Sequence, residues 1–156
     1  MTKLMFAFAA ASALPCVSAV SAQAPARIDL EAVQPIGGDW GYRAIAGGSE
    51  ADFVDAAASV RLQIRCNRAA RTVSIVRTGV PAAAPTLAIW TTSLSRTVPA
   101  RFLATKDLVA DVASTDPLLD AIAFSRGRIA TAASGAPMLA VASGPETVRV
   151  IEDCRT

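Results

Sequence analysis

Two arginines that flank a glycine, in the segment Ser125-Arg126-Gly127-Arg128, are the residues best suited to recognising a ligand. A guanidinium can hold a carboxylate or phosphate through two parallel hydrogen bonds, so a close pair could grip one anion. We therefore predict a ligand-binding corner at Ser125, Arg126 and Arg128. The alternative is structural, because Gly127 suits the end of a helix and cations there complement the helix dipole.

Paired carboxylates suggest a second chemistry, acid–base hydrolysis. Asp116 and Asp120 lie four residues apart on one predicted helix, and Glu152 and Asp153 adjoin Cys154. Two such groups could act as general acid and general base. Asp116 also suits the N-cap of the helix, and Asp120 lies in its first turn, where the helix dipole favours an anion. These carboxylates make a small envelope hydrolase the alternative function.

Four arginines could form a basic surface. Arg61 and Arg65 share one face of a predicted strand, and Arg68 and Arg71 lie in the turn that follows. Such a surface could meet anionic lipid, peptidoglycan or an acidic partner, but an ordinary solvated sheet face is the better explanation of these arginines. The formal net charge of only +2 argues against nucleic acid as a partner.

The chain contains no histidine, which excludes His-based triads, Cys–His dyads and the usual zinc and haem sites with a His ligand. Of its three cysteines, Cys16 lies in the N-terminal apolar run, which leaves Cys66 and Cys154. A pair of cysteines in an oxidising compartment usually forms a disulfide, with two buried free thiols as the alternative. Because a disulfide also removes the thiolates, we expect no metal site and no cofactor.

The N-terminus has the features of a secretory signal. Lys3 precedes an uncharged apolar run over residues 4–20, and small residues at Val20-Ser21-Ala22 fit the cleavage rule. We predict a signal peptide over residues 1–22 and a periplasmic protein, with secretion to the extracellular space as an alternative. The run is too short and interrupted for a stable membrane span. A lipoprotein signal that uses Cys16 is a further alternative.

The rest of the chain has the length of one domain with one core. Pro25, Pro35 and Gly37-Gly38 predict a flexible lead over residues 23–38, so the ordered domain covers residues 39–156. Apolar alternation is clearest at 59–66 and predicts a strand that turns Cys66 toward the core. Further strands are predicted at 40–44, 51–56, 72–78, 86–94, 95–103, 108–113, 128–133 and 138–142.

Two helices complete the pattern. Asp116 as N-cap, Pro117 at the first position and Gly127 beyond the end predict a helix over residues 117–126. A second helix begins at Pro145 and places Cys154 on its apolar face. These elements predict an α+β fold, an antiparallel sheet or small β-sandwich with two short helices. The disulfide between Cys66 and Cys154 would contribute about 4 to 5 kcal/mol as an upper estimate.

Three segments carry a resemblance to known proteins, namely 61–66, 116–128 and 149–155, with the motifs Ser-Arg-Gly-Arg and Ile-Glu-Asp-Cys-Arg. Over residues 40–155 the chain resembles small exported proteins of sphingomonad-type alphaproteobacteria. An early Trp, a Cys that ends a strand and a Cys near the C-terminus are more distantly similar to the invasion-associated locus B proteins of the envelope. The resemblance implies export but no particular activity, so it assigns no catalytic residue.

These features together predict a non-enzymatic binding or interaction module, an envelope accessory or inhibitor-type protein. Its contact surface would be a sheet face or the corner at residues 125–128. Its partner would be another envelope protein or a component of the cell wall.

Overall fold

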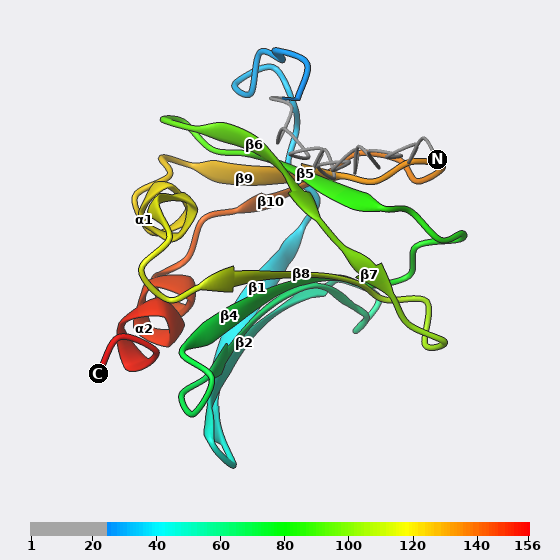
Figure 1. Cartoon of the computed structure of the whole chain (residues 1–156). Helices are drawn as coiled ribbons and strands as arrows, with labels where there is room; N and C mark the ends of the chain where they lie inside the picture. Colours follow the sequence, from blue (N-terminus) through cyan, green and yellow to red (C-terminus); the bar gives the residue numbers. More distant parts are fainter. Residues whose placement is uncertain (1–24) are drawn as a thin grey trace, which may run out of the picture.

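The computed structural model describes residues 25–156, and the predicted signal peptide over residues 1–22 lies outside the described residues. The described chain forms two antiparallel sheets and two short helices, which confirms the α+β class (Figure 1). The larger sheet has the order β1 (Gly38–Ile45), β2 (Gly48–Asp55), β3 (Val60–Asn67), β4 (Thr72–Arg77), β8 (Leu108–Ala113) and β7 (Arg101–Phe102). The smaller sheet has the order β10 (Leu139–Ala142), β9 (Arg128–Ala132), β5 (Thr86–Trp90) and β6 (Ser95–Pro99).

The main core lies between the two sheets and the helices. In β3 the inward side chains of Leu62, Ile64 and Cys66 are almost fully buried, while Arg65 on the opposite face is exposed. Side chains of the smaller sheet, such as Leu87 and Ile129, belong to the same cluster. One continuous core therefore holds both sheets together, as expected for a single domain of this size.

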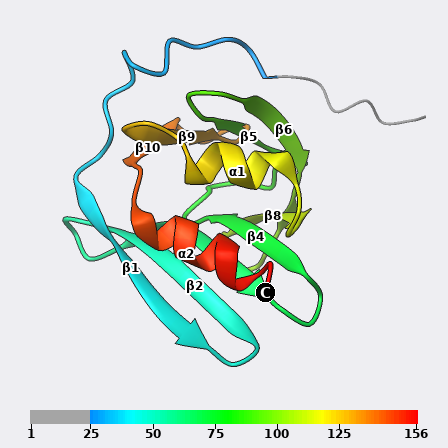
Figure 2. The ribbon, with the colours of Figure 1, turned by 90° about the vertical axis from the view of Figure 1, so that its left-hand side faces the viewer.

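The helices α1 (Pro117–Ala123) and α2 (Pro145–Asp153) lie across one side of the sandwich, as Figure 2 shows. The predicted N-cap of α1 is present, because Oδ1 of Asp116 accepts a hydrogen bond of 2.8 Å from the amide of Leu118. The helix ends at Ala123, before the predicted residue 126. The chain is diverted there because the Ser125 side chain bonds to backbone groups outside the helix.

The predicted disulfide is present between Cys66 and Cys154. Their Cα atoms lie 5.4 Å apart, although 88 positions separate them in the chain. Cys66 faces the core from β3, and Cys154 follows the last residue of α2. The bond therefore joins the C-terminal helix to a central strand of the larger sheet.

The predicted strand at 95–103 is two strands in different sheets. Residues 95–99 form β6 at an edge of the smaller sheet, and residues 101–102 form β7 at an edge of the larger one. The predicted strand at 86–94 also ends early, at Trp90, because Thr91 turns the chain back. Its hydroxyl donates to the carbonyl of Leu94 at 2.7 Å and accepts from the Leu94 amide at 2.9 Å.

The N-terminal segment, which we expected to be flexible over 23–38, packs against the outer face of the smaller sheet from Ala26 onward. Ile28, Leu30 and Val33 contact a small cluster centred on Trp90. The indole Nε1 of Trp90 donates to the carbonyl of Ala26 at 3.0 Å. The segment 26–36 is called the strap below.

Neither helix within residues 25–156 is long and apolar enough to cross a membrane.

Candidate functional site

The predicted corner at residues 125–128 is held together by a serine hydroxyl. Oγ of Ser125 donates to the carbonyl of Arg128 at 2.6 Å and accepts from the amide of Thr92 at 3.2 Å. Gly127 has a φ of +79°, which lets the chain reverse between these two bonds. Because Ser125 is buried, its role here is to attach the end of α1 to the turn after β5.

The two arginines of the corner make different contacts. Nη1 of Arg128 donates to the carbonyls of Glu31 at 2.8 Å and Val33 at 2.5 Å, so this guanidinium fixes the strap. Arg126 is exposed and forms no ion pair with any residue that the structure describes. The structure therefore does not bring the two guanidiniums together as a fork. Ligand binding at this corner stays a prediction, and it depends on Arg126.

Phe124 adds an apolar group to the same corner. Its side chain is 75% exposed, and Met138 at 39% is the only other large apolar side chain that is exposed among residues 25–156. Aromatic and arginine side chains are enriched where proteins contact one another. The exposed side chains of Phe124 and Arg126, two residues apart in the chain, therefore form a small surface suited to binding, which we call the Phe124 corner.

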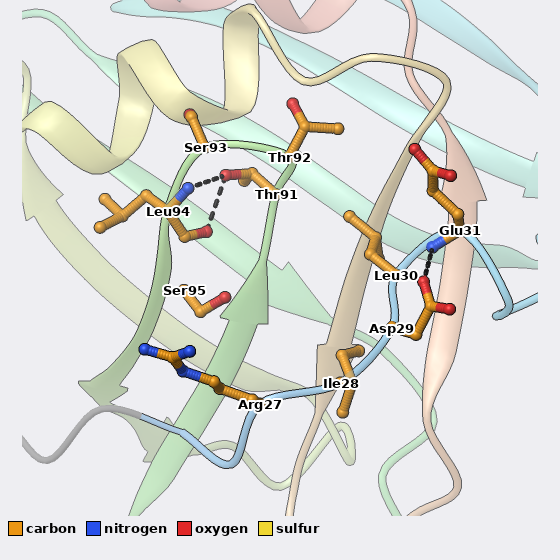
Figure 3. Close-up of a pocket in the computed structure, with 10 residues that line it drawn as sticks. All are labelled: Arg27, Ile28, Asp29, Leu30, Glu31, Thr91, Thr92, Ser93, Leu94 and Ser95. Carbon is orange, nitrogen blue, oxygen red and sulfur yellow. Dashed lines mark hydrogen bonds between the residues drawn. The ribbon is translucent and has the colours of Figure 1, made fainter.

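A cleft of about 540 Å³ lies between the strap and the turn that joins β5 to β6 (Figure 3). The turn contributes hydroxyls and the strap contributes charges, with apolar groups on both sides. The lining residues are Arg27, Ile28, Asp29, Leu30, Glu31, Thr91, Thr92, Ser93, Leu94 and Ser95. The cleft adjoins the Phe124 corner, because the amide of Arg126 donates to Oγ1 of Thr92 at 3.2 Å.

Several polar groups of this cleft are available to a ligand. The hydroxyls of Ser93 and Ser95 make no hydrogen bond to any described residue, and Arg27 and Glu31 make no ion pair there. Asp29 accepts a hydrogen bond of 3.1 Å from the amide of Glu31, which shapes the strap locally. The cleft thus offers both charges and free hydroxyls, a lining that suits a polar group of a partner.

The candidate catalytic carboxylates are committed to other partners. Oδ2 of Asp116 pairs with Arg96 at 2.8 Å, and Asp120 pairs with Arg155 at 2.8 Å. Burial acts to raise the pKa of Asp116, but the hydrogen bond and charge of Arg96 and the amide of Leu118 hold it below its usual value. Asp116 therefore carries no proton to donate near neutral pH.

A second polar cluster joins α2 to β1. The Tyr42 hydroxyl donates to Oδ2 of Asp153 at 2.8 Å, and the guanidinium of Arg149 lies 4.0 Å from the centre of the Tyr42 ring. Burial acts to raise the pKa of Asp153, but the hydroxyls of Ser49 and Tyr42 and the charges of Arg68 and Arg149 together lower it. Beside this cluster is a pocket of about 330 Å³ lined by Tyr42, Pro145, Glu146 and Arg149.

The predicted basic surface is largely neutralised. Arg61 pairs with Asp55 at 2.9 Å, and Arg65 pairs with Glu50 at 2.7 Å. Arg68 pairs with Asp153 at 3.9 Å and donates to the carbonyl of the same residue at 3.2 Å. Arg71 is exposed and donates to the carbonyl of Arg155 at 3.4 Å, without an ion pair to any described residue. Three of the four arginines therefore offer little charge to an anionic partner.

Two polar features of the larger sheet were missed from the sequence. Glu50 is 1% exposed although it lies on the outer face of β2, because Arg43 and Arg65 cover its carboxylate. Arg77 is 3% exposed and donates to the carbonyls of Arg61 at 3.3 Å and Thr78 at 2.9 Å. Burial lowers the pKa of Arg77 to about 10, with a smaller contribution from Arg61.

Residues 25–156 hold no group of three or more acidic, cysteine or histidine side chains that could bind a metal ion. No family model, curated protein or solved structure matches the chain.

Proposed function

We propose that this protein is a non-enzymatic binding module of the periplasm, exported by a signal peptide over residues 1–22, whose Phe124 corner docks on another envelope protein. The observation that carries the proposal is the 75% exposure of Phe124. Covering a large exposed apolar side chain with a partner removes it from water, which makes binding more favourable.

Charge and rigidity support the same surface. Arg126 lies two residues after Phe124 and has no ion pair within the described residues, so it can meet a carboxylate of the partner. The backbone beneath these side chains is held by Ser125 through bonds to Arg128 and Thr92. A rigid corner loses little conformational entropy on binding. The expected partner therefore presents an apolar pocket beside an acidic group.

The other features of the chain agree with an envelope location. A disulfide between Cys66 and Cys154 fits an oxidising compartment. The carboxylates of Asp116, the N-cap of α1, and of Asp120 within α1 both pair with arginines, which favours binding over the hydrolase alternative. The cleft beside the corner supplies additional polar contacts at the rim of the same surface.

The test compares variants in a binding assay. The mature protein and its Phe124→Ser and Arg126→Glu variants are immobilised and exposed to envelope extract, with Met138→Ser as the matched control for loss of an exposed apolar side chain. We expect one protein to be retained by the wild type and by Met138→Ser, and released by both corner variants.

Two outcomes would contradict this function. Equal retention by all four proteins would show that the corner is not the contact surface. Co-sedimentation with purified peptidoglycan, unchanged by Phe124→Ser, would identify a cell-wall component as the ligand instead of a protein. A reduced and alkylated sample, run in parallel, measures how far recognition depends on the disulfide-linked fold.

A further inference from the structure

The two sheets have four edges, and three of them are short or covered. The edge strand β7 has two residues, and β6 has five and ends at Pro99. On β10 the strap pairs with the free side, because the amide of Ile36 donates to the carbonyl of Ala140 at 2.9 Å. Natural proteins commonly use shortness, proline and covering segments to prevent edge strands from pairing with other chains.

The fourth edge, β1, has none of these features. It runs for eight residues in unbroken register with β2, contains no proline, and is the outermost strand of the larger sheet in Figure 2. No backbone hydrogen bond joins its outer side to another described segment. The strand is therefore open to pairing with a further strand.

A glycine in the middle of β1 has no explanation within one copy of the chain. A Cβ atom on Gly38 would lie 2.3 Å from the carbonyl oxygen of Val54, so that glycine is required by packing. A Cβ on Gly41 would meet nothing within 4 Å, and Gly41 does not have a positive φ. Glycine weakens a strand interior and often marks a place where another backbone approaches closely.

The charges of β1 are arranged symmetrically about Gly41. Asp39 and Arg43 lie two residues to either side, on the same face of the strand. Both are exposed. Asp39 has no ion pair with any described residue, whereas Arg43 already pairs with Glu50 and, at 3.3 Å, with Asp52 of β2. Trp40 and Tyr42 occupy the opposite face in the same symmetric way, and each is only partly buried.

We propose that the protein forms a two-fold symmetric dimer in which the β1 strands of two copies pair antiparallel, with Gly41 opposite Gly41. In this register Asp39 faces Arg43 of the partner subunit, and the reciprocal pair forms by symmetry. Trp40 faces Tyr42 of the partner subunit on the other side, which is a favourable aromatic cross-strand pair. The two larger sheets become one continuous sheet.

This self-complementarity favours a second copy over a strand from another protein. It also lies apart from the proposed function, because neither the Phe124 corner nor the cleft includes a residue of β1. Because the two surfaces are separate, the failure of one proposal leaves the other intact. A dimer would present two Phe124 corners in one particle.

The first test measures mass in solution by light scattering after gel filtration, with protein isolated from cells that produce the full chain. We expect a dimer for the wild type and a monomer for Asp39→Lys, because the new lysine would face Arg43 of the partner subunit. Glu152→Lys is the matched control, since Glu152 is an exposed acidic residue of α2. The Glu152→Lys substitution changes the charge by the same amount as Asp39→Lys, and this variant should remain a dimer.

The second test fixes the register by cross-linking. A mixture of the Asp39→Cys and Arg43→Cys variants should form an intermolecular disulfide under mild oxidation, because these positions lie opposite one another in the proposed register, about 5 Å apart. Ala44→Cys alone should not, since the two copies of residue 44 would be about 20 Å apart at the strand rise of about 3.4 Å per residue. A monomeric wild type at high concentration, an unchanged dimer for Asp39→Lys, or equal cross-linking of the mixture and of Ala44→Cys would overturn the proposal.

Discussion

The hydroxyl of Tyr42 donates a hydrogen bond of 2.8 Å to Oδ2 of Asp153, and this contact joins the edge strand β1 to the end of α2. The same carboxylate immediately precedes Cys154, whose disulfide anchors the helix from the other side. The C-terminal helix is therefore attached to the larger sheet by the disulfide and by polar contacts of Asp153 with Tyr42 and Arg68, close together in the chain.

Tyr42→Phe should destabilise the protein by about 1 to 2 kcal/mol at pH 7, since it removes a hydrogen bond to a charged group and keeps the ring. Urea unfolding measures the difference. The pKa of Asp153 is lowered in the folded state. The stability contributed by its charge is therefore present above the unfolded pKa of about 3.9 and is lost as the pH falls through the lower folded value.

The difference between Tyr42→Phe and wild type should consequently shrink as the pH falls below about 4 and Asp153 of the folded protein, whose pKa is lower than that of the unfolded chain, takes up a proton. Measurements of unfolding at pH 7 and at pH 3 show whether the difference between the two proteins shrinks at low pH. A difference that is equal at both values would show that the Tyr42 hydroxyl does not act through the ionised carboxylate.

The double replacement of Cys66 and Cys154 by alanine should lower the free energy of unfolding by about 4 kcal/mol, because the closed loop spans 88 positions. Replacing both cysteines avoids leaving a reactive thiol. Urea unfolding of the variant beside the wild type checks the magnitude. A loss below about 1 kcal/mol would mean that the fold of α2 on β3 does not depend on the covalent link.

Arg128→Ala should release the strap without unfolding the domain, because the side chain donates to the carbonyls of Glu31 and Val33. We expect faster hydrogen exchange over residues 26–36 and a red shift of Trp90 fluorescence as its ring becomes exposed. Arg126→Ala is the matched control and should change neither signal. Unchanged exchange in Arg128→Ala would refute the role of this guanidinium.

Asp116→Ala should cost about 1 kcal/mol for the lost helix cap, with a further loss from the pair with Arg96. Asp116→Asn should cost less, because asparagine is an equally good N-cap and only the charge is lost. Thermal unfolding ranks the two variants. A hydrolytic activity that either variant abolished while the fold persisted would favour the envelope hydrolase.

Local patterns were enough to predict most of the elements. The alternation from Val60 to Cys66 identified the buried face of β3. The same alternation correctly predicted that Cys66 points into the core, where it bonds to Cys154. The Asp116-Pro117 pair located the start of α1 because capping is a local interaction. The prediction that α1 ends at residue 126 was wrong, because the end of the helix depends on Thr92, which approaches Ser125 only in the folded chain.

The candidate site was harder to predict for the same reason. The arginines at 126 and 128 look equivalent in the sequence, yet the strap carbonyls that engage Arg128 lie more than 90 positions away. The strap itself carried a usable signal, since the alternation of Ile28 and Leu30 fits an apolar surface. What was missing is the position of Trp90 beneath it, which only the pairing of β5 with β9 determines.

The most direct test of the central claim, that the Phe124 corner is the contact surface, is photo-cross-linking in living cells. A benzophenone amino acid replaces Phe124 in one strain and the exposed Ala104 of a distant turn in another. We predict one discrete adduct with a second protein from position 124 and none from position 104. No adduct at position 124, or the same adducts from both positions, would contradict the account.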